Sequence, residues 1–458
     1  MMRSASSGRC TMKIIDNKAL VMRLDDPTPV LTTIKQSEAL DSNTVAVKWD
    51  LKNVHRLRSF NIKAPSPIEG KYNWPGMYKP YDHQKTTAAF LTLNPRAFCF
   101  NQQGTGKTGS AIWAADFLMT QKIIRRVLVV CPMSIMDAAW RNDLFTFAMH
   151  RRVDIAHGSA DKRRKVIESD AEFVIINYDG IAIMQEELAA GGFDLIIVDE
   201  ATAYATATTK RWKALSKLVT ERTWLWMMTG TPAAQGPISA YGLAKLVNPR
   251  GVPRTFTAYR DSVMEKDGPF RWKPKPHAVQ TVHQILQPAI RFTKEECLDL
   301  PDMVYVRRRA EMSSQQKAFY KQLRKDHLLA LQGADVTAVN AAVMMNKLSQ
   351  LACGCVYTDD GDVLEFDITN RYKTLREVID EAANKVIVFV PFQHTIDLLT
   401  EKLRADKITV GVISGKVSAG KRTQLFREFQ TTPDPRVLVV QPQAAAHGVT
   451  LTAADTIV

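Results

Sequence analysis

The segment Phe98–Thr108 constrains the fold of this chain more than any other, and it reads F-C-F-N-Q-Q-G-T-G-K-T. A short apolar run leads into a glycine-rich turn, which is followed by residues with helical spacing. Gly104 and Gly106 let backbone N–H groups converge on phosphate oxygens without a clash from a Cβ atom. The first turn of the following helix would add its positive dipole. Strand, phosphate-binding turn and helix in this order predict an α/β nucleotide-binding fold.

The side chains of the same turn suit a phosphate site. Lys107 would reach the β- and γ-phosphates of a nucleotide, Thr108 would ligate Mg²⁺, and Thr105 belongs to the same binding turn. The full pattern asks for glycine five residues before Gly106, where this chain has Asn101. Asparagine tolerates left-handed backbone angles better than most residues. An ordinary glycine-rich turn is the alternative, and the strand before it and the helix after it argue against that interpretation.

Short apolar runs alternate with helical patterns in two stretches of the chain. Such runs predict strands that are buried on both faces of a parallel sheet, with helices covering each face. In the first stretch we predict a helix at 108–120 and strands at 97–100, 127–131, 173–176, 195–198 and 225–228. In the second we predict helices at 395–404 and 421–430, and strands at 386–390, 410–413 and 437–440.

Four regions follow from these patterns. Residues 1–75 contain one strand-like run at 44–49 and are expected to form a small accessory region. Residues 76–250 form the first nucleotide-binding lobe. Residues 251–370 begin with an irregular stretch rich in proline and aromatic residues, continue with helical spacing, and are expected to be a linker with a helical insertion. Residues 371–458 form the second lobe.

An acid pair follows one of the predicted strands, in F-D-L-I-I-V-D-E-A-T. Asp199 would hold Mg²⁺ through its coordination shell, and Glu200 would polarise an attacking water. Two carboxylates after a strand also occur on ordinary exposed turns. The phosphate turn that precedes this pair strengthens its interpretation as part of a nucleotide site. The next predicted strand ends in T-G-T-P, where Thr229 and Thr231 could hydrogen-bond Glu200 or the region of the γ-phosphate.

The charge balance favours a polyanionic partner. The chain has 61 Lys and Arg residues against 47 Asp and Glu, a formal net charge of +14. Such a surplus favours nucleic acid before a membrane. No apolar run reaches the ~18 residues of a membrane span. Several of the six cysteines lie in apolar stretches, which favours reduced thiols in a cytoplasmic protein over a disulfide framework.

The order and spacing of these motifs resemble those of the superfamily-two helicase-like ATPases, above all the Swi/Snf-type branch with its phage and bacterial members. The segment K-P-Y-D-H-Q resembles the one upstream of the phosphate turn, where Gln84 would read adenine. V-V-C-P-M-S, which contains Pro132 and precedes Trp140, resembles the first nucleic-acid-contact motif. I-N-Y, which ends at Tyr178, resembles the next one. The resemblance covers roughly residues 79–458.

Two further segments extend the resemblance into the second lobe. E-C-L-D-L-P at 296–301 resembles the segment before that lobe, and 437–458 resembles the fifth motif, which senses both nucleic acid and ATP. The family often has G-x-G-L-N-L where this chain has A-H-G-V-T-L. His447 and Gly448 are therefore candidate nucleic-acid contacts, with a plain loop histidine as the alternative.

The family's sixth motif, which carries arginine fingers, would follow Val458. An arginine finger raises turnover by roughly 10³–10⁵-fold. We therefore expect this chain to bind ATP and to hydrolyse it weakly, with a C-terminal truncation as the expected cause.

The resemblance implies two RecA-like lobes that bind ATP and Mg²⁺ and couple hydrolysis to movement along DNA. It also implies contacts with the backbone phosphates of duplex DNA, with little sequence specificity and a steep dependence on salt. Two other functions stay open. One is a small-molecule kinase with a phosphate turn, and the other is a nucleotide- and DNA-binding protein with weak turnover.

Overall fold

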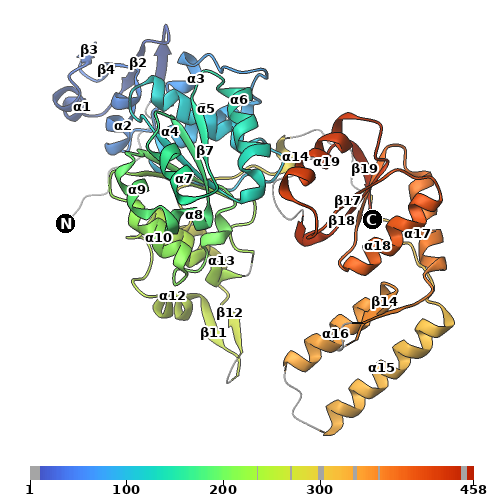
Figure 1. Ribbon diagram of the computed structural model, residues 1–458. Helices are drawn as coiled ribbons and strands as arrows, with labels where there is room; N and C mark the ends of the chain where they lie inside the picture. The colour runs from blue at the N-terminus through green and yellow to red at the C-terminus, as the bar shows by residue number, and fades with distance from the viewer. Residues whose placement is uncertain are drawn as a thin grey trace. The chain divides into compact units, whose positions relative to one another are not determined.

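The computed structural model describes residues 11–234, 236–268, 271–297, 304–333, 338–358, 362–444 and 451–458. The chain forms two compact units, residues 1–300 and 301–458 (Figure 1). Each has its own parallel sheet, so the predicted α/β class with two sheet-containing units is confirmed. None of the helices in the described ranges is long and apolar enough to cross a membrane.

The first unit begins with a small antiparallel sheet of four strands in the order β1-β2-β4-β3. Residues of β2 and β4 are buried alternately, so the sheet covers a core on one face only. That core is closed by α1 (Thr28–Thr33) and α2 (Leu51–Ser59). The strands are β1 (Met12–Ile15), β2 (Ala19–Arg23), β3 (Ser37–Ala39) and β4 (Thr44–Lys48). Only the last of them was predicted from the sequence.

The main sheet of the first unit has seven parallel strands in the order β13-β5-β10-β9-β6-β8-β7. Every residue of β6, β8 and β9 is buried, because helices cover both faces. The strands are β5 (Arg96–Cys99), β6 (Val127–Cys131), β7 (Val153–Ala156), β8 (Phe173–Asn177), β9 (Leu195–Val198), β10 (Trp224–Met228) and β13 (Ala289–Ile290).

Two cores lie on opposite faces of this sheet. Along β6, Leu128 and Val130 belong to one core, whereas Val127 and Val129 belong to the other. The face with Val127 packs against α4 (Asp82–Leu93), α5 (Lys107–Thr120) and α6 (Asn142–Phe147), with α3 (Ile68–Lys71) beside α4. The opposite face packs against α7 (Ala160–Ile167), α8 (Tyr178–Ile183), α9 (Gln185–Ala190), α10 (Lys210–Leu218) and α11 (Ala240–Val247).

The sequence predicts a linker from residue 251 onward, whereas residues 251–297 pack into the first unit. Tyr259, Val263 and Ile285 lie in its core, and β13 pairs with β5 at the sheet edge. The prediction was wrong here because β13 is only two residues long and carries no strand pattern. The elements are α12 (Phe256–Val263), β11 (Met264–Lys266), β12 (Trp272–Pro274), α13 (Ala278–Ile285) and α14 (Lys294–Cys297).

The second unit has a four-stranded parallel sheet in the order β17-β18-β16-β19. Alternate residues of β18 face two cores, with Val437 and Val439 in one and Leu438 and Val440 in the other. The strands are β16 (Lys385–Phe389), β17 (Val410–Ile413), β18 (Val437–Val440) and β19 (Ala454–Ile457). The other elements are α15 (Ser314–Gly333), α16 (Ala338–Ala352), β14 (Cys355–Tyr357), β15 (Val363–Glu365), α17 (Thr369–Glu381), α18 (Gln393–Ala405) and α19 (Ala419–Thr431).

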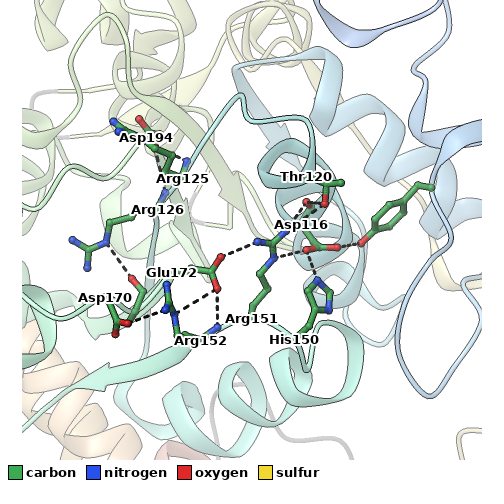
Figure 2. A network of polar contacts seen from close by, with 12 residues as sticks. Asp116, Thr120, Arg125, Arg126, His150, Arg151, Arg152, Asp170, Glu172 and Asp194 are labelled. Atoms are coloured by element: carbon green, nitrogen blue, oxygen red, sulfur yellow. Dashed lines mark hydrogen bonds and ion pairs between the residues drawn. The ribbon is translucent and has the colours of Figure 1, made fainter.

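A buried carboxylate ties the far end of α5 to the segments around it (Figure 2). Asp116 accepts hydrogen bonds from the Tyr72 hydroxyl, from His150 Nε2 at 2.8 Å and from Arg151 Nε at 2.5 Å. The other arm of Arg151 bonds Glu172, just before β8, at 2.8 Å. Removing one partner from a buried ion pair is costly, because the remaining charge loses its compensation. This network therefore holds the helix that follows the phosphate turn.

We expect Asp116→Asn to lower the free energy of unfolding of the first unit by about 2–4 kcal/mol, because Arg151 loses its most buried partner. All eight tryptophans lie before residue 301, so urea unfolding followed by tryptophan fluorescence reports this unit alone. Asp170→Asn is the matched control, since Asp170 pairs with Arg152 at the surface and its side chain is 79% exposed. Equal shifts of the two variants would contradict the assignment.

Candidate nucleotide-binding site

The predicted phosphate turn lies between β5 and α5. Gly104 and Gly106 have φ angles of +85° and +77°, in the left-handed region that favours glycine. Gly106 directly precedes the first helical residue, Lys107. The structure therefore gives both glycines the backbone conformations that the sequence pattern requires, with the N–H groups of the first turn of α5 beside them.

Side chains and carbonyl groups brace this turn from inside. The Thr105 hydroxyl donates to the Gln102 carbonyl at 2.8 Å, and Lys107 Nζ donates to the same carbonyl at 3.3 Å. His83 Nε2 lies 2.9 Å from the Thr105 carbonyl, which can only accept, so His83 is the donor. The ammonium group of Lys107 is thus held over the turn.

Gln84, the residue implied to read adenine, lies against the same turn. Its Oε1 accepts from Tyr81 N at 2.9 Å and its Nε2 donates to the Thr105 carbonyl at 3.4 Å. A Cβ atom on Gly106 would come within 1.9 Å of this Nε2, so the close approach depends on glycine. The structure therefore brings Gln84 together with the phosphate turn.

The structure shows why Asn101 occupies the position of the leading glycine of the pattern, which the sequence did not reveal. The φ angle of Asn101 is not positive, so tolerance of a left-handed backbone does not explain why asparagine replaces glycine here. The side chain is fully buried. Its Nδ2 donates to the Thr87 hydroxyl of α4 at 2.9 Å, and its Oδ1 accepts from Phe292 N at 3.0 Å. Asn101 thus links α4 to the segment after β13.

That segment runs along the phosphate turn. Gln102 N donates to the Phe292 carbonyl at 2.9 Å, and Gln102 Oε1 accepts from Lys294 N at 3.0 Å. These partners lie far apart in the sequence, with separations of 191 residues for Asn101 and Phe292 and 192 residues for Gln102 and Lys294. A pattern read along the chain therefore had no signal for them.

The acid pair follows β9, two strands from β5 in the sheet, with β10 between them. Asp199 is almost fully buried, and both of its carboxylate oxygens have internal donors. Trp140 Nε1 donates to Oδ2 at 2.9 Å, and Glu200 N donates to Oδ1 at 2.9 Å. Burial raises the pKa of Asp199, whereas Trp140 and the ammonium of Lys107 favour its ionised form.

Glu200 has a left-handed backbone, with φ 46° and ψ 52°. A non-glycine residue pays a strain energy of order 1 kcal/mol for such a conformation, which is concentrated at functional sites. Its Oε1 accepts from Gln103 Nε2 of the phosphate turn at 3.5 Å, a long contact that joins the two motifs.

The loop after β10 lies beside the phosphate turn, because a Cβ atom on Gly230 would stand 3.6 Å from Gln103 N. Thr229 is fully buried, and its hydroxyl accepts from Thr231 N at 3.2 Å. Of the two predicted partners of these threonines, Glu200 is not the one bonded here, because Thr229 closes its own loop and Gln103 reaches Glu200. Contact with the region of the γ-phosphate stays a prediction.

The predicted nucleic-acid contacts of the first unit lie near the acid pair. Pro132 ends β6 and is buried, whereas Met133 and Ser134 after it are exposed. Tyr178 begins α8, and its hydroxyl donates to the Asp199 carbonyl at 2.7 Å. His447 and Gly448 lie outside the described residues, as does the end of the predicted segment at 296–301.

Sequence reasoning missed one acidic group near this site. Asp143 lies in the first turn of α6, one turn after Trp140. Burial raises the pKa of Asp143 to about 7, with a further contribution from the negative charge of Asp199. An aspartate within an amphipathic helix gives no such signal in the sequence.

The residues present fit a magnesium–nucleotide group. The described part of the chain has no group of three or more His, Cys, Asp or Glu residues that could hold a metal by itself. Mg²⁺ is commonly bound by one or two protein oxygens together with the phosphates of the nucleotide, which matches Thr108 and Asp199 rather than an all-protein cage.

We expect Asn101→Gly, which restores the leading glycine of the pattern, to lower the free energy of unfolding by about 1–3 kcal/mol, because buried hydrogen bonds to Thr87 and Phe292 are lost. Tryptophan fluorescence in urea measures the change. A glycine variant as stable as the wild type would show that the amide does not matter here.

The comparisons with known proteins cover both units. The model of the SNF2-related domain matches residues 83–357, more than half of the chain, and that of the helicase conserved C-terminal domain matches residues 370–458. The second match begins at α17, before the sheet of the second unit. The predicted resemblance and the fold of two RecA-like lobes are therefore confirmed.

Several curated relatives are similar over most of this chain. An uncharacterized ATP-dependent helicase of Mycoplasma genitalium is 23% identical over 78% of this chain and 34% of its own length. A SWI/SNF-related matrix-associated actin-dependent regulator of chromatin subfamily A-like protein 1 homolog of Caenorhabditis elegans is 26% identical over 96% of this chain and 64% of its own. This chain thus spans about a third of the length of the Mycoplasma relative and less than two thirds of the length of the Caenorhabditis relative.

A protein of an Acyrthosiphon pisum secondary endosymbiont phage, putative protein p41, is 22% identical over 82% of this chain and 83% of its own length. Among solved structures, the Sulfolobus solfataricus SWI2/SNF2 ATPase core in complex with dsDNA has 20% identity and a TM-score of 0.46, over 84% of this chain and 82% of that one. On the match to more than half of its length, the chain belongs to the family of the SNF2-related domain.

Proposed function

We propose that this chain is a DNA-stimulated ATP hydrolase that moves along duplex DNA. The observation that carries the proposal is the meeting of the phosphate turn, the acid pair and the loop after β10 at the carboxyl ends of β5, β9 and β10. Open parallel sheets bind their ligands at this edge. Relatives named as ATP-dependent helicases support the same reaction.

Each residue has a role that its position allows. Lys107 and the N–H groups at the start of α5 would neutralise the phosphates of ATP. Thr108 and Asp199 would hold the magnesium ion, which stabilises the charge that develops on the phosphates. Glu200 would orient and polarise the attacking water, and its left-handed backbone, a conformation concentrated at functional sites, supports a functional role.

The proposal of a DNA partner rests on charge and on the family. The net charge of +14 favours a polyanion, and the family motifs at Pro132 and Tyr178 lie beside the acid pair. Contacts would go mainly to backbone phosphates, so binding would show little sequence preference.

We expect ATP hydrolysis to rise when duplex DNA is added, and Lys107→Ala and Glu200→Gln each to lower the rate by roughly 100-fold or more, because each removes a charge aimed at the reacting phosphate or water. Lys217→Ala, on the exposed face of α10, is the control and should keep the wild-type rate. Turnover that ignores DNA would support a kinase-like enzyme. DNA binding without turnover in the wild type would support a nucleotide- and DNA-binding protein.

Binding to duplex DNA should weaken steeply with salt. If three or more phosphates are neutralised, affinity should fall by roughly 40-fold or more between 50 and 200 mM salt, since the logarithmic slope is about −0.9 per phosphate. Fluorescence anisotropy with two duplexes of unrelated sequence measures both properties. Tight binding that ignores salt, or that prefers one sequence strongly, would contradict backbone recognition.

A further inference from the structure

Two side chains outside the acid pair hold it in place. Tyr178 ends one predicted nucleic-acid-contact segment, and Trp140 follows the other, which ends at Ser134. Trp140 donates to the side chain of Asp199 and Tyr178 donates to its main chain. We propose that Trp140 and Tyr178 are positioning residues that couple DNA contact to the Asp199–Glu200 pair, an inference that rests on the proposed function.

Trp140 reaches Asp199 from an unusual piece of backbone. Residues Met136–Arg141 form a π-helical turn between the 3₁₀ turn Met133–Ile135 and α6. π-helical turns are rare, and they are found frequently at functional sites. The turn begins two residues after the exposed Ser134 and places the Trp140 indole, which is fully buried, 2.9 Å from Asp199 Oδ2.

This hydrogen bond fixes the orientation of the carboxylate. Glu200 N occupies the Oδ1 side at 2.9 Å, so donors on both oxygens define the rotation of the Asp199 side chain. Each carboxylate oxygen can accept more than one hydrogen bond, so both retain capacity for water in a metal shell. A partner that orients a metal-binding carboxylate tunes its affinity for the metal. Trp140 should therefore set how well Asp199 serves Mg²⁺.

Tyr178 acts on the main chain of the same pair. Its hydroxyl lies 2.7 Å from the Asp199 carbonyl and 3.2 Å from the Glu200 carbonyl, so it braces both sides of the left-handed residue. The ring is itself held, because the Arg211 guanidinium lies 5.4 Å from its centroid and pairs with the neighbouring Asp179 at 2.8 Å. Tyr178 should therefore set the position of the Glu200 carboxylate.

The two contacts predict different defects. A shift of the segment at Ser134 on DNA binding would move the π-helical turn and Trp140, and a shift of the start of α8 would move Tyr178. Trp140 bears on the magnesium ligand, whereas Tyr178 bears on the water-polarising residue. Loss of the first should appear as a higher magnesium requirement, and loss of the second as a lower maximal rate with DNA at saturating magnesium.

The experiment uses the full chain with Trp140→Phe and Tyr178→Phe, which keep the rings and remove one hydrogen-bond donor each. The matched controls are Trp113→Phe and Tyr259→Phe, whose buried donors bond the carbonyls of Pro75 at 2.8 Å and Pro237 at 2.7 Å. The readouts are ATP hydrolysis with and without duplex DNA across magnesium concentrations, and binding of fluorescent ADP with magnesium or with EDTA.

For Trp140→Phe we expect a roughly 10-fold rise in the magnesium concentration for half-maximal rate, in the range seen when a partner of a metal ligand is removed. Its ADP affinity in EDTA should match the wild type, while the gain in affinity on adding magnesium should shrink. For Tyr178→Phe we expect a roughly 10-fold lower DNA-stimulated rate with an unchanged magnesium requirement. Both controls should behave as the wild type does.

Variants with the wild-type magnesium response and DNA stimulation, or controls with the same defects, would overturn this inference. A wild-type chain that ignores DNA would instead overturn the proposed function. The ADP measurements still decide the role of Trp140 in that case, because they need no DNA and no turnover.

Discussion

The parallel pairing of β10 with β5 on one side and β9 on the other is the constraint on which the candidate site depends. Parallel strands end at the same edge of a sheet, so three loops that are distant in sequence start side by side. One of them is the phosphate turn, one begins with Asp199, and one contains Thr229. The register is fixed by burial on both faces, since a slip of one residue would turn every side chain to the wrong core.

The same double burial explains which parts of the fold the sequence predicts. Strands such as β6 and β9 are continuous apolar runs, and their predicted bounds agree with the structure to the residue. In the second sheet the predicted bounds of β17 and β18 also agree with the structure, and β18 is buried along its whole length. Two-residue β13 is too short to show such a run, and Lys13 interrupts the apolar residues of β1. β2 has a short apolar run at 19–22, but it is buried on one face only and was not predicted.

The candidate site also has features that the sequence predicts and features that it does not. The phosphate turn is local, because its glycines, Lys107 and the start of the helix lie within a few residues of one another. The role of Asn101 is not local, since it depends on Thr87 before it and Phe292 far after it. Trp140 likewise acts on a residue that is distant in the sequence. It was noted only as a neighbour of a contact motif, and its bond to Asp199 exists because a π-helical turn directs the indole inward.

The acid pair shows why such distant support is needed. A buried carboxylate with a raised pKa and a neighbouring residue in a left-handed conformation both cost stability. Charge-assisted hydrogen bonds offset part of that cost, and those from Trp140 and Glu200 N go to the carboxylate itself. The Tyr178 hydroxyl adds contacts to both carbonyls. Because Trp140 and Tyr178 come from segments that precede the pair in the chain, any movement of those segments changes the energy of the pair directly. A site held in this way is sensitive to any shift of the segments around it, as the proposed stimulation by DNA requires.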